Sequence, residues 1–240
     1  ALLPITNRFM YLEEGDIARL TRDSIEVFVA GKLVERPVKE LDATVSNASK
    51  GEYKHYMLKE IYEQPEAIQQ TISQALNGNQ LRDDFLKNAD ADFAQIQNVQ
   101  IIACGTSYHA GMIAKYWFEQ LINLPCQVEI ASEFRYRTPV IVNNTLYVCI
   151  SQSGETADTL AALRDTQKRA LAKQINIATL TICNVATSSM VRETNHSLLT
   201  LAGPEIGVAS TKAFTTQLAA LMLVVLKVGQ VKQTISETKI

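Results

Sequence analysis

The sequence has little excess charge of either sign and few cysteines. Its 240 residues carry a formal net charge of -2 at pH 7, so it lacks the basic field that attracts nucleic acid. The four cysteines form neither metal-ligand pairs nor the framework of a small disulfide scaffold. We therefore expect free, buried thiols in a reducing compartment, a cytoplasmic location, and no metal, cofactor or nucleic-acid partner.

Long hydrophobic runs are also missing. The longest run, Leu218 to Leu226, is shorter than the roughly 20 residues that cross a bilayer, and no signal peptide is visible. We accordingly expect no membrane partner. With 47% hydrophobic and 20% charged residues, the chain has enough apolar side chains for one good-sized core or two small ones. It begins at Ala1 without a methionine, and we expect a piece of a longer protein.

Residues 1–43 have the pattern of a small β-rich unit. Short strand-like stretches alternate with turns that contain glycine. These stretches are Arg8–Leu12, Ser24–Val29 and Leu33–Glu35. Residues 44–54 are polar and contain Gly51, a composition that predicts a linker.

From residue 55 to 232, short apolar runs alternate with amphipathic stretches. We expect strands at residues 99–104, 126–130, 145–150, 175–182 and 196–201, and helices at 107–122, 131–136, 156–173 and 211–228. A helical arm precedes them, from His55, with a restart at Pro65 and a third helix over Arg82–Phe93. The alternation predicts an α/β fold, a three-layer αβα sandwich with a flavodoxin-like parallel sheet.

A hydroxyl-rich loop connects the strand at residues 145–150 to the next helix. It reads Ser151-Gln152-Ser153-Gly154-Glu155-Thr156. The free N–H groups and the positive dipole end of a helix start, together with three hydroxyls, suit an anion. The alternative interpretation is an ordinary helix N-cap.

A second loop of the same kind follows the strand at residues 99–104. It contains Gly105, Thr106 and Ser107. Ligands of open α/β sheets bind beyond the carboxyl ends of strands, where the strand order reverses, so we expect both loops to bind one phosphate. Neither loop has the P-loop or the Gly-x-Gly-x-x-Gly pattern. A small phosphate monoester, such as a sugar phosphate, therefore fits better than a nucleoside triphosphate.

A third loop, residues 203–212, again connects a strand to a helix start. Its backbone either lines the sugar pocket or serves only as a helix cap. Lys212 is expected to face solvent, as lysines at helix starts usually do, and the alternative is an amine nucleophile. For His109 and Cys104 we favour a packing role over ligand contact or nucleophilic attack.

Four motifs resemble one enzyme family. They are Ile102–Tyr108, Ala131–Arg137, Ser151–Thr159 and Glu205–Phe214, and the resemblance extends to Tyr11–Asp16 and Lys59–Pro65. The chain is similar to the glutamine–fructose-6-phosphate aminotransferases (isomerising). That family implies a glutaminase domain followed by two sugar-isomerase (SIS) domains, which convert fructose 6-phosphate to glucosamine 6-phosphate with ammonia from glutamine.

The resemblance also implies roles for individual residues. The phosphate-binding positions are Ser107, Ser151, Gln152, Ser153 and Thr156, and the sugar-lining positions are Gly105, Thr106, Val208, Ala209 and Ser210. The family's cysteine nucleophile is absent here, and its catalytic lysine, glutamate and histidine belong to the second SIS domain. We therefore expect the end of a glutaminase domain and the first SIS domain, with no catalytic residue.

The sequence also bears on association and leaves two rival functions open. We expect the apolar helix at residues 211–228 to expose part of its surface. In the resembled family the SIS domains also pair between subunits, and the two points together predict a homodimer. One rival function is a stand-alone SIS-type isomerase of sugar phosphates. The other is a non-enzymatic module that senses sugar phosphates in a transcription regulator.

Overall fold

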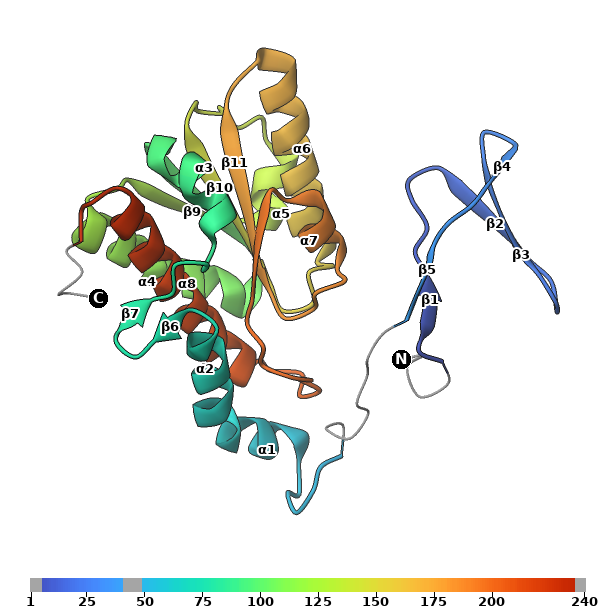
Figure 1. The fold of residues 1–240 in the computed structure, drawn as a ribbon, viewed down its shortest axis with the longest axis horizontal. Coiled ribbons are helices and arrows are strands. Elements are labelled where there is room, and N and C mark those ends of the chain that lie inside the picture. The colour runs from blue at the N-terminus through green and yellow to red at the C-terminus, as the bar shows by residue number, and fades with distance from the viewer. Residues whose placement is uncertain (1–5, 41–48, 236–240) are drawn as a thin grey trace. The chain divides into compact units, whose positions relative to one another are not determined.

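The computed structural model describes residues 6–40 and 49–235. The chain divides into two compact units, residues Ala1–Ser49 and Lys50–Ile240, each described here by itself (Figure 1). The domain boundary predicted between residues 43 and 44 lies outside the described residues.

The first unit consists of short antiparallel strands. Strand β1 (Arg8–Met10) pairs with β5 (Val38–Glu40), and β2 (Asp16–Leu20), β3 (Ile25–Val29) and β4 (Lys32–Val34) form a second sheet. The predicted strands are confirmed, but β2 forms where a connection was expected and β5 was not predicted. Within the described part of this unit only Val27 is buried, while Ile17 and Leu20 are 70% and 71% exposed. This unit therefore has almost no core of its own.

The second unit contains a five-stranded parallel sheet. Its strands are β8 (Asn98–Ala103), β9 (Cys126–Ile130), β10 (Thr145–Ser151), β11 (Ile177–Cys183) and β12 (His196–Leu199). Their spatial order is β12-β11-β10-β8-β9, and every neighbouring pair is parallel. Numbered along the chain this is the flavodoxin-like order 2-1-3-4-5, as predicted. The order reverses between β8 and β10.

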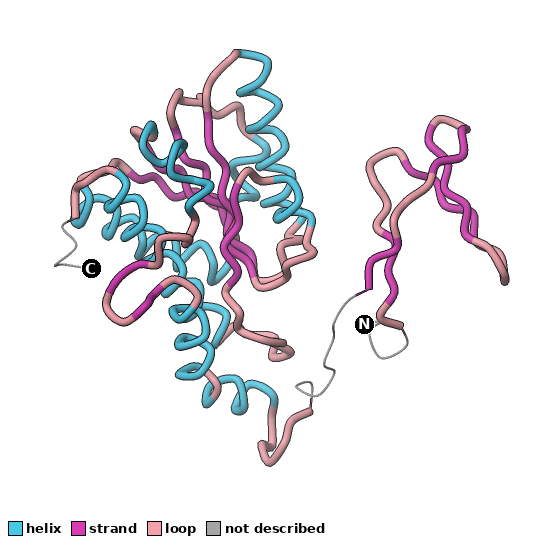
Figure 2. Tube along the Cα trace, in the orientation of Figure 1, coloured by secondary structure: helices cyan, strands magenta, loops and turns pink. Residues whose placement is uncertain are grey.

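Helices cover both faces of the sheet and make three layers (Figures 1 and 2). Helices α4 (Gly105–Ile122) and α8 (Lys212–Val231) lie on one face, while α5 (Ala131–Tyr136), α6 (Ala157–Lys173) and the short α7 (Ser189–Glu193) lie on the other. Strand β10 shows why both faces need cover, since Val148 packs in the core with α4 and α8 while Tyr147 packs with α5 and α6. Alternate residues of a strand point to opposite faces.

The helical arm before the sheet differs from its prediction at one place. Helices α1 (Tyr56–Tyr62) and α2 (Gln64–Ser73) form as predicted. A hairpin of β6 (Leu76–Asn77) and β7 (Gln80–Leu81) follows them. The helix expected over Arg82–Phe93 is wrong in its first half, which is a turn. That turn leads into a 3₁₀ turn at Lys87–Ala89 and then into α3 (Asp90–Gln95). Asn77-Gly78 is a strong hairpin signal, and Leu86, with φ of 46°, interrupts helical geometry.

The position of helix α8 explains its apolar composition. By length and composition alone it would be long enough to cross a membrane. In the structure it packs against α4, α2 and α3, and 12 of its residues are buried. None of its large apolar side chains is exposed. The expectation that this helix exposes apolar surface is therefore wrong, because neighbouring elements of the same unit already cover it.

Candidate functional site

The two hydroxyl loops follow adjacent strands at the point where the strand order reverses. Ile150 lies opposite Ala103 in the parallel register of β10 and β8, so Ser151 and Gly105 begin their loops at the same edge of the sheet. The chain leaves β8 into α4 on one face and β10 into α6 on the other. Diverging connections open a crevice between two such strand ends, which is the usual ligand position of this fold class.

The loop after β10 is held together by its own hydroxyls. Ser151 is 2% exposed, and its Oγ lies 2.8 Å from Thr156 Oγ1 and accepts the Gly154 N–H at 3.0 Å. Ser153 Oγ accepts the Glu155 N–H at 3.2 Å. Although Thr156 is the N-cap residue of α6, its side chain makes no capping hydrogen bond to that helix. The hydroxyls of this loop thus bond to one another and to its own backbone, and its anion-binding role stays a prediction.

Position 154 requires glycine for two reasons, its backbone conformation and the lack of room for a side chain. Its φ is +67°, and an added Cβ would lie 2.2 Å from Ser188 Oγ. The loop is further fixed to the start of α7, because Met190 N–H donates to the Gly154 carbonyl at 3.2 Å and Ser189 N–H donates to Glu155 Oε1 at 2.6 Å. The shape of this loop is thus fixed by contacts within the chain.

The loop after β8 begins the first turn of α4. Gly105 has a φ of +57°, and open space surrounds the position of its missing Cβ. Ser107 is 8% exposed, whereas Thr106 and His109 are exposed. Tyr108 packs edge to face against His109. Gly105 and Thr106 are therefore accessible at this end of the strand, whereas Ser107 is buried.

The third loop is anchored at both ends and exposed at its tip. Glu205 accepts the N–H groups of Thr211 at 2.9 Å and Ala213 at 3.1 Å, which caps α8. Val208 and Ala209 are exposed and Ser210 is half-buried, with its hydroxyl 3.2 Å from Glu205 Oε2. The three predicted sugar-lining residues thus form the free tip of a braced loop.

The prediction that Lys212 faces solvent is wrong. Lys212 is 3% exposed, and its Nζ donates to Glu63 Oε2 at 2.7 Å. The reason is that helix α1 is followed directly by a carboxylate that reaches the start of α8. Burial raises the pKa of Glu63, but the hydrogen bond and charge of Lys212, together with Lys59, outweigh it and hold that pKa below its usual range.

Asn184 joins the loop after β10 to the third loop, and sequence reasoning missed it. Its backbone N–H donates to the Gln152 carbonyl at 3.1 Å. Its side chain donates to the Gly203 carbonyl at 2.7 Å and accepts the Ala202 N–H at 2.8 Å. The available signal was its place directly after a buried strand, at the carboxyl edge where ligand-binding loops gather.

A further ion pair holds the start of α6. Arg135 Nη1 donates to Asp158 Oδ1 at 2.7 Å, and this hydrogen bond raises the pKa of Arg135. Asp158 lies in the first turn of α6, beside the helix end where negative charge is favourable. The motif Ala131–Arg137 thus supports the loop at Ser151–Thr156 from the neighbouring helix.

The cysteines are free, and three of the four are buried. Burial raises the pKa of Cys149 to about 12, and burial with the charge of Glu119 does the same for Cys126. Such thiols are inert at neutral pH. Cys104, at the start of the loop after β8, is half-buried. Among the described residues, no group of histidine, cysteine or acidic side chains has a metal-binding arrangement.

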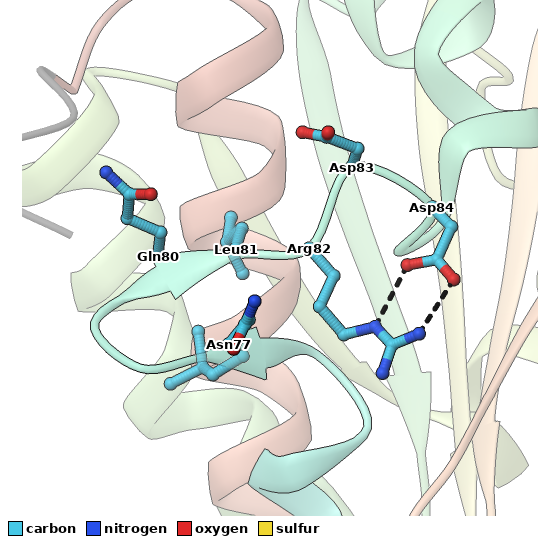
Figure 3. A pocket seen from close by; sticks show the side chains of 7 residues that line it. Asn77, Gln80, Leu81, Arg82, Asp83 and Asp84 are labelled. Atoms are coloured by element: carbon cyan, nitrogen blue, oxygen red, sulfur yellow. Dashed lines mark hydrogen bonds and ion pairs between the residues drawn. The ribbon is translucent and has the colours of Figure 1, made fainter.

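A hollow of about 570 Å³ lies at the β6–β7 hairpin (Figure 3). Its lining residues are Leu76, Asn77, Gln80, Leu81, Arg82, Asp83 and Asp84. The one arginine is already paired with Asp84 through two hydrogen bonds of 3.0 and 2.9 Å. None of the predicted site residues lines this hollow.

The comparisons with known proteins agree with this fold. The family model described as "SIS domain" matches residues 92–227, and the chain belongs to that family. Over 240 residues it is 85% identical to a glutamine–fructose-6-phosphate aminotransferase [isomerizing] of Acinetobacter baylyi and 57% identical to one of Pseudomonas syringae pv. tomato. These alignments cover 100% and 99% of this chain but 39% and 38% of the relatives.

One solved structure extends the similarity to three dimensions. The C-terminal domain of glucosamine-fructose-6-phosphate aminotransferase from Francisella tularensis is 52% identical, with a TM-score of 0.74, and the match covers 80% of this chain and 52% of that one. The predicted family resemblance and the predicted fold are both confirmed. The chain spans about two fifths of the length of its curated relatives.

Proposed function

We propose that this chain is part of a glutamine–fructose-6-phosphate aminotransferase, in which it holds the first SIS domain and the end of a glutaminase domain. The parent enzyme makes glucosamine 6-phosphate from fructose 6-phosphate and glutamine, and this part binds the sugar phosphate. The observation that carries the proposal is the pair of hydroxyl loops at adjacent strand ends, in one of which the hydroxyls of Ser151 and Thr156 lie 2.8 Å apart.

The chemistry of the Ser151–Thr156 pair supports phosphate binding. Each hydroxyl has one hydrogen to donate. Their mutual hydrogen bond uses one of the two hydrogens, and Ser151 Oγ already accepts from the Gly154 N–H. The second hydrogen of the pair is therefore free to donate to a phosphate oxygen.

The remaining site residues complete this assignment. Ser107, Gln152 and Ser153 supply further donors to the phosphate at the two helix starts, where the dipole favours an anion. Gly105, Thr106 and the tip formed by Val208, Ala209 and Ser210 contact the sugar. This division of labour separates phosphate-binding residues from sugar-binding residues, and the two groups are testable with different ligands.

The proposed binding is tested by titrating the chain with fructose 6-phosphate and with fructose. We expect amide signals of residues 105–107 and 151–156 to shift with the phosphate ester and far less with the free sugar. Thr156→Ala and Ser151→Ala should each weaken binding by roughly 1–3 kcal/mol, the usual cost of losing a hydrogen bond to a charged group. Ser73→Ala, in an exposed position on α2, is the matched control. Equal shifts with both sugars would contradict the phosphate assignment.

At the level of the parent protein we propose a cytoplasmic homodimer with glutamine amidotransferase activity. The use of glutamine rests on the name that the relatives carry, the location rests on the free cysteines, and the dimer rests on the habit of the family that the sequence resembles. A stand-alone sugar-phosphate isomerase or a sensing module would form its product, or give its response, without glutamine. Glucosamine 6-phosphate formation by the parent should instead depend on glutamine, and formation that is independent of glutamine and ammonia would overturn the proposal.

A further inference from the structure

Helix α1 buries a carboxylate and exposes its apolar side chains. Glu60 is 2% exposed and is the only buried residue of this described helix, whereas Leu58, Ile61 and Tyr62 are 40%, 42% and 66% exposed. Apolar residues normally occupy the inner face of a helix. A carboxylate in that position requires hydrogen-bond partners to offset its loss of water.

The partners of Glu60 are in the third loop. Its Oε1 accepts the N–H groups of Ile206 at 2.6 Å and Gly207 at 3.0 Å, and its Oε2 lies 3.2 Å from the Gly207 nitrogen. These residues are separated from Glu60 by 146 and 147 positions in the chain. Hydrogen bonds to an ionised acceptor are about twice as strong as neutral ones, so this carboxylate fixes the backbone of the loop directly before its tip.

Gly207 provides independent support for the same contact. An added Cβ at this position would lie 2.5 Å from Glu60 Oε2 and 3.5 Å from Met57 Cα. The glycine therefore leaves room for the approach of helix α1 and its carboxylate.

Three neighbouring side chains extend the contact along the same segment. Glu63 pairs with Lys212 at 2.7 Å, just beyond the loop. Thr71 Oγ1 of α2 donates to the Thr200 carbonyl, and Gln74 Nε2 donates to the Leu199 carbonyl at 2.7 Å. The helical arm thus holds the chain from the end of β12 to the start of α8 and leaves the tip at Val208 and Ala209 exposed.

We propose that Glu60 is a positioning residue that holds the sugar-lining tip of the third loop in its binding conformation. The inference rests on the proposed function, because it assigns the tip to the sugar. Glu60 itself does not touch the ligand. It acts through the backbone of Ile206 and Gly207, and its loss should affect recognition of the sugar while recognition of the phosphate is retained.

Two ligands separate a positioning role from a general structural one. Inorganic phosphate reports on the loops at residues 105–107 and 151–156, and fructose 6-phosphate reports on those loops together with the third. For the 240-residue chain with Glu60→Gln, we expect calorimetric affinity for fructose 6-phosphate to fall roughly tenfold and affinity for phosphate to stay within about twofold. Glu60→Ala should lose more, since Gln keeps one oxygen acceptor and Ala keeps none. Glu66→Gln, exposed on α2, is the matched control and should change neither affinity.

Amide spectra of Glu60→Gln show directly whether the loop has moved. The signals of Ile206 and Gly207 should shift, while those of residues 151–156 stay in place. An equal loss of affinity for both ligands, or an unchanged affinity for fructose 6-phosphate, would overturn the positioning role. A wild-type chain that binds phosphate but gains no affinity from the sugar would overturn the sugar assignment of the third loop. A wild-type chain that binds neither ligand would overturn the proposed function. The positioning role of Glu60 fails in both cases.

Discussion

At the residue scale, the candidate site depends on a few positions whose environment permits one kind of side chain. Gly154 combines a left-handed backbone with contact against Ser188, whereas Gly78 has a similar φ of +62° and open space around it. The two glycines therefore separate the cost of backbone conformation from the cost of a steric clash. Only Gly154 lies in the loop at Ser151–Thr156.

Gly154→Ala should destabilise the chain more than Gly78→Ala. Both substitutions place alanine in the left-handed region, at a cost of about 1–2 kcal/mol. Gly154→Ala must also displace Ser188, and we expect at least about 1 kcal/mol of additional loss. The measurement is the free energy of unfolding in urea. Equal losses for the two variants would show that the segment at Ser188 yields freely.

At the scale of elements, the sheet edge is organised by ties between segments that follow different strands. Asn184 follows β11 and bonds to the loop after β10 and to the segment after β12. Asn176 precedes β11 at the opposite edge and is exposed, with side-chain contacts of 3.4 Å to Gln95 and Asn144. One strand thus carries an asparagine at each end, and only the one at the carboxyl edge supports the site.

Asn184→Ala should cost roughly 1–3 kcal/mol of stability, because two backbone groups of residues 202 and 203 lose their partner. Asn184→Asp keeps the acceptor for the Ala202 N–H but loses the donor to Gly203, and it should cost less. Amide hydrogen exchange of residues 200–203 should increase in the same order. Asn176→Ala is the control. An exchange pattern that is unchanged at residues 200–203 would contradict the tie.

At the scale of the whole molecule, the surface that remains apolar is not on α8. Helix α4 exposes Ile113, Tyr116 and Leu121 at 38%, 55% and 46%. Ile113 and Tyr116, three residues apart, are neighbours on one side of that helix, and Leu121 lies further along it. Neighbouring exposed apolar residues of this kind mark interaction surfaces more often than isolated ones do. The proposed homodimer therefore has a candidate surface within the SIS domain.

Sedimentation equilibrium at tens of micromolar should give a dimer for the 240-residue chain. Tyr116→Glu should convert it to a monomer, since it places a charge at the centre of the proposed contact. Leu20→Glu, an equally drastic change at a position of the first unit that is 71% exposed, is the matched control and should remain dimeric. A clean monomer for the wild-type chain, or a dimer that survives Tyr116→Glu but not Leu20→Glu, would refute this assignment.

Local pattern by itself determined the strand and helix alternation and the two hydroxyl loops at the ends of β8 and β10. Hydrophobic periodicity is a property of neighbouring residues, and a strand end followed by glycine and hydroxyls is visible without a structure. The sugar-lining role of Val208 to Ser210 remains a prediction, because no contact in the structure tests it.

Only the tertiary structure decided the environment of the side chains that support these loops. In the sequence Glu60 and Lys212 have the pattern of ordinary surface residues, yet both are buried. The sequence does not reveal this, because their partners lie almost 150 residues away. The turn at Leu86 and the cover of α8 were likewise invisible locally. Each depends on which segments the fold brings together, and a pairing between distant segments leaves no period in the sequence of either one.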